Sequence, residues 1–186
     1  MKLLLHTCCA PCLIYPKKVL EERDFEVVSF FYNPNIHPYT EYKKRLDSLK
    51  EYAQISKVKL YTTPDYDIES FFGAVGGKIE EPDRCIACWR LRLGKSAKKA
   101  RELGIDVFTT TLLVSPYQNK KLIKKAGEQA AEEEGVKFYY QDFSDGFREA
   151  YNEARNSGLY LQKYCGCLFS ERARYLKKYR KINEKI

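Results

Sequence analysis

The sequence lacks long apolar runs, internal repeats and low-complexity segments. No hydrophobic stretch approaches the ~18 residues that a membrane-spanning helix needs, so we expect no membrane partner. The residues before His6 include one lysine and only three leucines, too few for the apolar region of a secretory signal. We therefore expect a cytoplasmic protein. In the cytoplasm structural disulfides are rare, so clustered cysteines indicate metal binding or catalysis.

Acidic residues are missing from one stretch of the chain and scarce in another. Residues 84–101 contain seven basic residues and no acidic residue, and residues 171–186 contain seven basic and two acidic residues. Each run adjoins a pair of cysteines. A basic run is often a solvated helix face, but two runs beside cysteine pairs favour a polyanionic substrate, nucleic acid first. The candidate RNA contacts in these runs are Arg90, Arg92, Lys98, Lys99, Arg174 and Lys178.

The apolar content of the chain is sufficient for one folded domain. The 186 residues are 44% hydrophobic and 31% charged, which is typical of a soluble globular protein, and two full domains would be cramped. We expect a single domain over residues 1–186. It would consist of an α/β core over residues 1–141 and a helical appendage over residues 142–186 that carries the last two cysteines.

Five apolar segments alternate with helical patterns along the chain. The predicted strands cover residues 2–6, 25–32, 58–62, 106–114 and 136–140. Predicted helices begin at Pro11, after an N-cap at Thr40, at residue 67, at Cys85 with Gly104 as the left-handed cap, and at Ser115-Pro116. Parallel strands need crossover helices, so this alternation predicts a three-layer α/β sandwich with a mainly parallel five-stranded sheet.

Seven cysteines fall in three tight groups, whereas a use as buried apolar residues would scatter them. Cys8, Cys9 and Cys12 lie on the predicted turn from the first strand into a helix. Ligands of open α/β sheets bind at the carboxyl ends of strands, and a helix N-terminus favours thiolate. This group is therefore suited to metal binding or redox chemistry, and we expect the fold to bring the other groups to it.

Cys85 and Cys88 have the spacing of a two-ligand metal unit at the start of a helix. With thiolates from the first group they would complete a zinc site or a four-iron cluster, and spacing alone does not separate the two. The adjacent Cys8 and Cys9 reach different irons of one cluster more easily than a single zinc, which favours iron–sulfur. Cys12 is able to replace Cys8, so the choice of four ligands stays open.

Cys165-Gly166-Cys167 would close a small ring on oxidation, so a disulfide there is strained and easily reduced. The central glycine permits the backbone angles that such a ring needs. The competing interpretations are a second metal site beside the first and two incidental thiols. His6 and Tyr164, each within two residues of a cysteine, are the candidate proton donors.

Four segments, in order along the chain, carry a family resemblance. They are residues 6–12 (HTCCAPC), 85–92 (CIACWRLR), 110–119 (TTLLVSPYQN) and 164–167 (YCGC). Together they resemble the cobalamin-independent epoxyqueuosine reductases of the QueH type. The resemblance implies the last step of queuosine synthesis, in which the epoxide oxygen is removed from a modified guanine at the wobble position of tRNA.

The same resemblance implies a [4Fe-4S] cluster and a fold related to the HUP group of nucleotide-binding domains. By position, Cys8, Cys9, Cys85 and Cys88 match the cluster cysteines, and Cys165 and Cys167 match a redox-active pair. Many HUP relatives have a glycine-rich phosphate loop after the first strand. Residues 7–12 contain no glycine, which argues against the use of ATP.

Converting an epoxide to an alkene takes two electrons and two protons, releases water, and requires an external electron donor. A single cluster transfers one electron at a time, so the site needs two sequential deliveries or a second store, which the Cys165/Cys167 dithiol is able to supply. The alternative is a second metal ion, iron for example, near Cys12 or the late pair, acting as a Lewis acid. The expected partner is the tRNA anticodon loop, with Trp89 and Tyr117 as stacking residues. Two other classes stay open, a zinc-stabilised RNA-binding module and a metal-free thiol-disulfide oxidoreductase.

Overall fold

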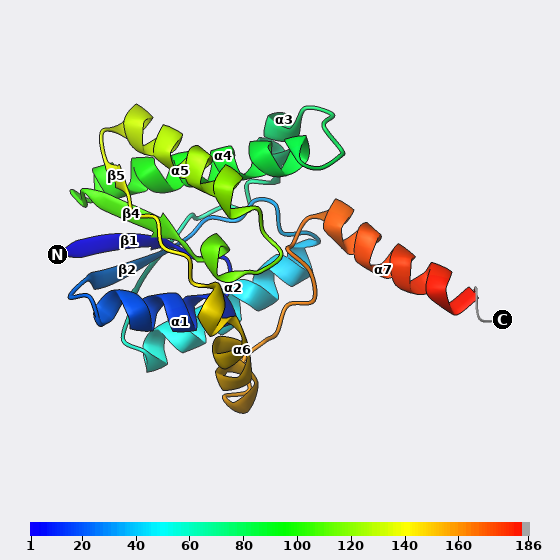
Figure 1. Cartoon of the computed structure of the whole chain (residues 1–186), viewed down its shortest axis with the longest axis horizontal. Coiled ribbons are helices and arrows are strands. Elements are labelled where there is room, and N and C mark those ends of the chain that lie inside the picture. Colours follow the sequence, from blue (N-terminus) through cyan, green and yellow to red (C-terminus); the bar gives the residue numbers. More distant parts are fainter. Residues whose placement is uncertain (184–186) are drawn as a thin grey trace.

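Five parallel strands form one sheet in the computed structural model, which describes residues 1–183 and the side chains of residues 1–176 (Figure 1). The sheet order is β3-β2-β1-β4-β5, and every neighbouring pair of strands is parallel. The strands are β1 (Lys2–His6), β2 (Glu26–Phe31), β3 (Lys59–Thr62), β4 (Val107–Thr110) and β5 (Lys137–Phe138). The predicted five-stranded parallel sheet is confirmed.

Helices cover both faces of this sheet. One face is covered by α1 (Ala10–Glu21), α2 (Tyr39–Ile55) and α6 (Phe147–Asn156), and the other by α4 (Asp83–Glu102) and α5 (Lys120–Glu134) (Figure 1). α3 (Ile68–Val75) packs against α4, and α7 (Leu168–Asn183) extends away from the body of the molecule. The predicted three-layer α/β sandwich is therefore confirmed. None of the described helices has both the length and the hydrophobicity that crossing a membrane requires.

β1 is the centre of the sheet and of the hydrophobic core. Leu3, Leu4 and Leu5 have no exposed surface, because β2 and β4 flank the strand and helices cover both of its faces. The chain continues from β1 through α1 to β2 on one side, whereas β4 joins β1 on the other. The strand order therefore reverses between β1 and β4. Ligands of open α/β sheets bind beyond the carboxyl ends of the strands at such a point.

The strand predicted over residues 106–114 is too long. β4 ends at Thr110, because the Thr110 hydroxyl accepts the N–H of Leu112 and caps a 3-10 helix over Thr111–Val114. Tight turns of this kind follow from local side-chain hydrogen bonds that compete with the sheet. The chain thus turns inward immediately after β4, at the carboxyl edge of the sheet.

The helix predicted from Ser115-Pro116 begins later, at Lys120. The Asn119 side chain accepts the N–H of Leu122 and acts as its N-cap. Residues 115–119 form a loop instead, and this loop lies at the same edge of the sheet as the turn after β4.

Gly104 (φ 65°) follows α4 in the left-handed conformation, as predicted. Gly76 (φ 52°) follows α3 in the same conformation, which residues other than glycine rarely adopt. The predicted N-cap at Thr40 is wrong, because Thr40 lies inside α2. The helix begins at Tyr39, directly after Pro38. A proline at this position leaves no N–H without a partner.

The region after residue 142 first adds α6, which packs against α1 in the same layer of the sandwich. The chain then returns through the irregular segment 157–167 before α7 begins (Figure 1). Leu159 in this segment is buried in the main core. The return carries the third cysteine group back to the carboxyl edge of the sheet. The division into a 1–141 core and a 142–186 appendage remains a prediction.

Candidate active site

A cavity of about 660 Å³ lies at the carboxyl edge of the sheet. Its volume falls in the range that small-molecule and cofactor sites occupy. Its walls come from four parts of the chain: the turn after β1, the start of α4, the loop before α5 and the irregular segment 157–167. Six of the seven cysteines, from all three sequence groups, line it: Cys8, Cys12, Cys85, Cys88, Cys165 and Cys167.

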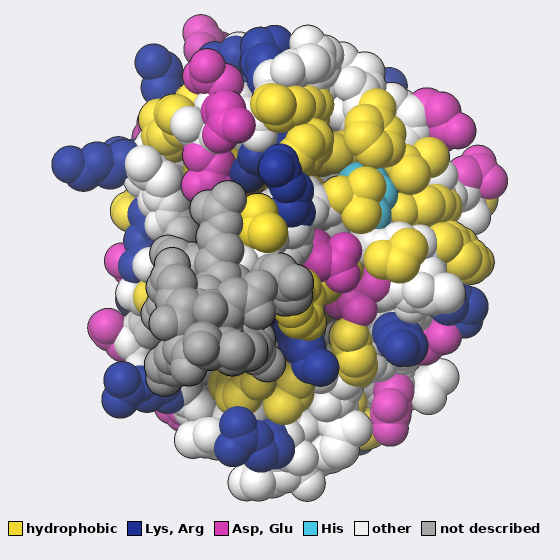
Figure 2. Space-filling model, turned by 90° about the vertical axis from the view of Figure 1, so that its right-hand side faces the viewer, with side chains coloured by type: hydrophobic (Ala, Val, Ile, Leu, Met, Phe, Trp, Pro, Cys, Tyr) yellow, Lys and Arg dark blue, Asp and Glu magenta, His cyan; other side chains and the backbone are white. Residues whose placement is uncertain are grey.

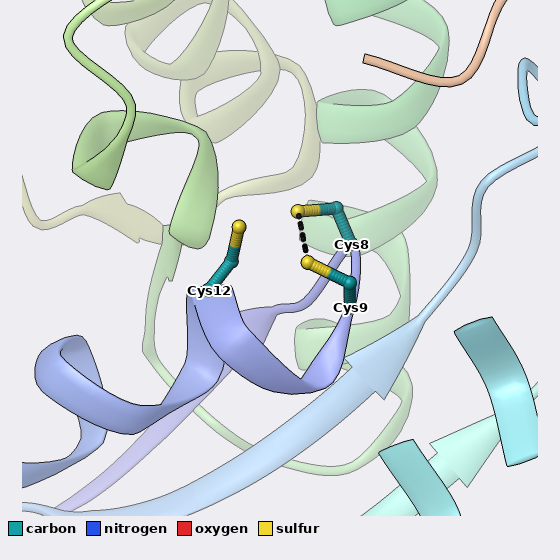
Figure 3. A group of neighbouring side chains, drawn as sticks. All are labelled: Cys8, Cys9 and Cys12. Atoms are coloured by element: carbon teal, nitrogen blue, oxygen red, sulfur yellow. Dashed lines mark hydrogen bonds between the residues drawn. The ribbon is translucent and has the colours of Figure 1, made fainter. Parts of the chain in front are cut away.

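The first cysteine group occupies the turn from β1 into α1 (Figure 3). The Sγ atoms of Cys8, Cys9 and Cys12 lie within 4.8 Å of one another, and those of Cys8 and Cys9 are 3.7 Å apart. The neighbouring thiols of Cys12 and Cys9 lower the pKa of Cys8 well below its usual range, whereas the pKa values of Cys9 and Cys12 are raised. Three converging, largely buried sulfurs that share negative charge form a donor set suited to a metal.

Thr111, the first residue of the 3-10 helix after β4, holds Cys8 in place. Its hydroxyl accepts the N–H of Cys8 at 3.2 Å and lies 3.4 Å from the Cys8 sulfur. Because β1 and β4 are neighbours, the early end of β4 is what brings this hydroxyl to the first cysteine group. The mispredicted strand end is therefore part of the site.

The second group lies at the start of α4, where each cysteine has an arginine beside it. Arg84 Nη2 is 4.0 Å from Cys85 Sγ, and Arg92 Nη1 is 3.9 Å from Cys88 Sγ. Burial raises the pKa of Cys85 to about 12 and also raises the pKa of Cys88, while both guanidinium groups oppose this shift. The arginines therefore favour the thiolate form that metal binding requires.

Arg92 also connects the second group to the first. Its Nη2 donates to Asn33 Oδ1 at 2.6 Å, and Asn33 Nδ2 donates to the carbonyl of Thr7 at 2.9 Å. Thr7 immediately precedes Cys8. Arg92 and Asn33 are almost completely buried, so this chain of hydrogen bonds fixes the helix α4 against the end of β1.

The third group depends on the backbone of Gly166. Its φ of 126° lies in a region that side chains rarely adopt, and a Cβ atom there would come 2.8 Å from Ile36 Cγ1. The sulfurs of Cys165 and Cys167 are 3.9 Å apart. The glycine thus lets both neighbouring cysteines turn toward the same side of the loop.

The two thiols of this pair have different environments. The hydrogen bond with Cys167 lowers the pKa of Cys165 to about 5, and the hydroxyl of Ser170, 3.0 Å away, acts in the same direction. The same hydrogen bond raises the pKa of Cys167. Cys165 is exposed and Cys167 is buried. A thiolate that accepts a hydrogen bond from a neighbouring thiol is the arrangement of a reactive cysteine pair.

Comparison with known proteins agrees with this geometry. The family model described as epoxyqueuosine reductase QueH matches residues 3–173. The chain belongs to the QueH family of epoxyqueuosine reductases. The resemblance inferred from the four sequence segments is thereby confirmed, and a QueH protein is an oxidoreductase of queuosine biosynthesis.

Curated QueH relatives match over most of this chain. The enzyme of Dehalococcoides mccartyi is 36% identical over 174 residues, which cover 94% of this chain and 94% of the relative. The Thermotoga maritima enzyme is 36% identical, over 90% of this chain and 88% of the relative. The Helicobacter pylori enzyme is 37% identical, over 90% of this chain and 49% of the relative. A solved structure, the predicted subunit of tRNA methyltransferase from Methanocaldococcus jannaschii, is less similar, with a TM-score of 0.49 and 13% identity over 82% and 74% of the two chains.

The surroundings of His6 in this QueH chain support a structural role, and a proton-donating role for His6 remains a prediction. It has no exposed surface and does not line the cavity. Its Nδ1 pairs with the Thr110 hydroxyl at 2.8 Å and its Nε2 with the Tyr32 carbonyl at 3.2 Å. Burial lowers the pKa of His6 to about 3. Both nitrogens of the ring are therefore engaged by groups of the core.

Tyr164 does line the cavity, but its hydroxyl points elsewhere. The hydroxyl donates to the carbonyl of His37 at 2.5 Å, and burial raises the pKa of Tyr164. Its ring lies under the Arg45 guanidinium, 5.4 Å from centroid to carbon. These contacts support a role in holding the loop, and a proton-donating role for Tyr164 remains a prediction.

The two predicted stacking residues differ in their accessibility. Trp89 is buried, and its indole N–H donates to Gln118 at 3.2 Å, so only part of its ring faces the cavity. Tyr117 is 86% exposed at the cavity mouth. Tyr117 is therefore more accessible than Trp89 for stacking against a base.

The predicted phosphate contacts also differ in their exposure and in their distance from the cavity. Arg92 is buried, lines the cavity and lies beside Cys88, and its role as an RNA contact remains a prediction. Arg90 and Lys98 are exposed on α4, whereas Lys99 pairs with Glu102 at 3.2 Å. Arg174 is exposed and lines the cavity. The side chain of Lys178 lies outside the described residues.

Sequence reasoning missed several residues that shape this QueH site. Glu41 and Arg45 form a buried ion pair on α2, and Asn33, Thr111 and Gln162 bond to cysteines or to the residues that hold them. A signal for Arg45 was present, since it falls at helical spacing among the apolar residues of residues 39–55. A charged residue in such a stripe indicates a buried partner.

Proposed function

We propose that this chain reduces the epoxide of epoxyqueuosine in tRNA to the alkene of queuosine inside the cysteine-lined cavity. The observation that carries the proposal is the meeting of six cysteines from three distant segments in one cavity, together with three buried arginines. The family name supports the substrate. A cavity of about 660 Å³ has room for a modified base swung out of a tRNA loop.

The donor set fits an iron–sulfur cluster. We propose that Cys8, Cys9, Cys85 and Cys88 would hold a [4Fe-4S] cluster, which supplies single electrons when bound. The close approach of the Cys8 and Cys9 sulfurs and the cations beside Cys85 and Cys88 support this assignment. The open alternative is that Cys12 replaces Cys8, since the three sulfurs of the first group converge.

Cys12 also contacts the segment that leads to the late pair. Gln162 Nε2 lies 3.4 Å from Cys12 Sγ, and Gln162 belongs to the segment that leads to Cys165. We propose that Cys165 and Cys167 complete the reaction: the thiolate and the thiol give two electrons and one proton and become a disulfide, and solvent water supplies the second proton. The epoxide oxygen leaves as water, so atoms and electrons balance. In the alternative, Cys12 and the late pair hold a second metal ion, such as iron.

The tRNA would approach the cavity mouth from the α7 side. Figure 2 views this face and shows hydrophobic side chains gathered on part of it, with lysine and arginine side chains nearby. At the mouth, Tyr117 offers a stacking surface, and Lys163 and Arg174 are exposed cations. Aromatic and cationic side chains together bind single-stranded loops of RNA. An external electron donor would then restore the reduced state.

Anaerobic purification followed by metal analysis and absorbance spectroscopy tests the proposal. We expect iron with sulfide and a broad band near about 400 nm from the thiolate-held cluster. Zinc alone would indicate the RNA-binding module, and protein without metal would indicate a thiol-disulfide oxidoreductase. In either of these cases the reductase proposal fails.

The first matched variant pair for this test is Cys88→Ala and Cys167→Ala. Cys88→Ala removes a proposed cluster ligand, so we expect it to lose most of the bound iron and the visible band. Cys167 packs in the same apolar cluster as Cys88 but is not a proposed ligand, so Cys167→Ala should keep both. Full iron content in Cys88→Ala would contradict the ligand assignment.

A further inference from the structure

A buried ion pair on α2 has no role in the reaction described so far. Arg45 is 1% exposed, and its Nε donates to Glu41 Oε1 at 2.8 Å. Glu41, one helical turn earlier, is also buried. Desolvation of both charges offsets much of their attraction, and apolar residues of similar size often stabilise a protein equally well. The pair therefore needs an explanation other than stability.

Arg45 reaches from α2 to the backbone of the third cysteine group. Its Nη2 donates to the carbonyl of Tyr164 at 3.0 Å and its Nη1 to the carbonyl of Cys165 at 3.2 Å. The second oxygen of Glu41 accepts the hydroxyl of Tyr160. The ion pair thus binds the 160–165 segment at three points, and the planar guanidinium fixes two adjacent carbonyls at once.

The loop between β2 and α2 holds the same segment from the other side. The N–H of His37 donates to the carbonyl of Gly166 at 2.8 Å, and the Tyr164 hydroxyl donates to the carbonyl of His37. Gly166 packs so closely on Ile36 that it has no space for a side chain. The Cys165-Gly166-Cys167 turn therefore lies between two sets of contacts from one stretch of chain, residues 36–45.

We propose that Arg45, oriented by Glu41, is a positioning residue that holds the Cys165/Cys167 pair in place against the cavity. The inference rests on the proposed function for its catalytic consequence, but the contacts themselves do not depend on it. A displacement of about 1 Å in a reacting group costs about 10²-fold in rate. Arg45 acts on the backbone of the pair, so its loss should alter the chemical step and leave tRNA binding unchanged.

The test compares Arg45→Met, Arg45→Lys and Lys43→Met in the full-length chain. Lys43 forms an exposed ion pair with Asp47 on the same helix, at the same i,i+4 spacing, and serves as the matched control. Hydrogen–deuterium exchange of residues 159–167 is measured on the resting protein. Iron content, kcat and KM for tRNA are measured on the same preparations.

We expect faster exchange confined to residues 159–167 in Arg45→Met, a fall in kcat of about 10²-fold, and an unchanged KM. Arg45→Lys retains the charge but cannot donate to both carbonyls as a guanidinium does, so its kcat should lie between those of Arg45→Met and the unsubstituted chain. Lys43→Met should match the unsubstituted chain. If Arg45→Met does not fold, Glu41→Gln, which keeps the volume and an acceptor for Tyr160, should show a smaller change in the same direction.

Three results would overturn the inference. They are unchanged exchange in the 159–167 segment, exchange that rises equally throughout the domain, and full recovery by Arg45→Lys, which would assign the effect to charge alone. If the unsubstituted chain shows no reductase turnover while Arg45→Met still loosens the segment, the proposed function fails and the positioning role stands.

Discussion

At the scale of single residues, buried arginines are the recurring neighbours of the cysteines. Arg84 and Arg92 lie beside Cys85 and Cys88, and Arg45 binds the carbonyl of Cys165. Burial alone disfavours thiolates, and a nearby guanidinium compensates for this without competing as a metal ligand. Arg84 and Arg92 therefore oppose the effect of burial on the neighbouring thiols, and Arg92 and Arg45 link segments of the site.

Replacing Arg92 by methionine should weaken metal binding. The change keeps the apolar stem but removes the cation beside Cys88 and the bond to Asn33, and loss of a residue that supports a metal ligand lowers affinity about 10–100-fold. Iron retention against a chelator measures the effect. Arg90→Met, two residues away and exposed, is the control. Equal iron retention in the two variants would contradict this role of Arg92.

The late cysteine pair gives a second prediction at this scale. Cys165→Ser should keep the iron of the first two groups and abolish turnover, because a serine cannot form a disulfide with Cys167. Iron content and single-turnover reduction of substrate tRNA are measured together. Loss of one metal equivalent in Cys165→Ser would instead indicate that the pair holds a second metal ion.

At the scale of elements, α4 carries residues of two kinds. Its first turns hold cysteines and buried arginines at the cavity, and its exposed lysines lie further along. Lys98 is ten residues beyond Cys88, about 15 Å along the helix axis. The irregular 157–167 segment and the start of α7 instead bring Lys163 and Arg174 to the cavity mouth. The exposed lysines of α4 therefore lie farther from the site than Lys163 and Arg174 do.

We predict that Lys163→Ala/Arg174→Ala weakens tRNA binding more than Lys98→Ala/Lys99→Ala. Each lost phosphate contact should reduce the slope of log affinity against log salt by about 0.7, the value for single strands. Affinity is measured for each double variant over a series of salt concentrations. A larger effect of the α4 lysines would place the tRNA along that helix, and no effect of either pair would make both basic runs solvated surfaces.

At the scale of the whole molecule, the central strand supports both the core and the site. Leu4 has no exposed surface, and β1 leads directly into the first cysteine group. Leu4→Ala should lower the free energy of unfolding by about 2–5 kcal/mol, since it leaves a cavity in a packed core. Urea unfolding of the metal-free protein measures it. Ile55→Ala, at a side chain that is 66% exposed, should change it by less than about 0.5 kcal/mol.

The sequence by itself determined the features that depend on neighbouring residues. The five strands and their parallel arrangement follow from apolar segments separated by helical patterns, and the left-handed glycines after α3 and α4 follow from local backbone geometry. The three cysteine-containing segments, together with residues 110–119, were sufficient to identify the QueH family. Element boundaries failed where a side chain caps a turn, as Thr110 does after β4 and Asn119 does before α5.

Only the tertiary structure decided which side chains meet. His6 is two residues from a cysteine in sequence, but its two nitrogens are paired with Thr110 and Tyr32. Arg92 belongs to a basic run, but it is buried against Asn33. Arg45 binds carbonyls 119 and 120 residues further along the chain. Burial and hydrogen-bond partners of this kind depend on residues far apart in sequence, because the sheet order and the return of the 157–167 segment bring them together.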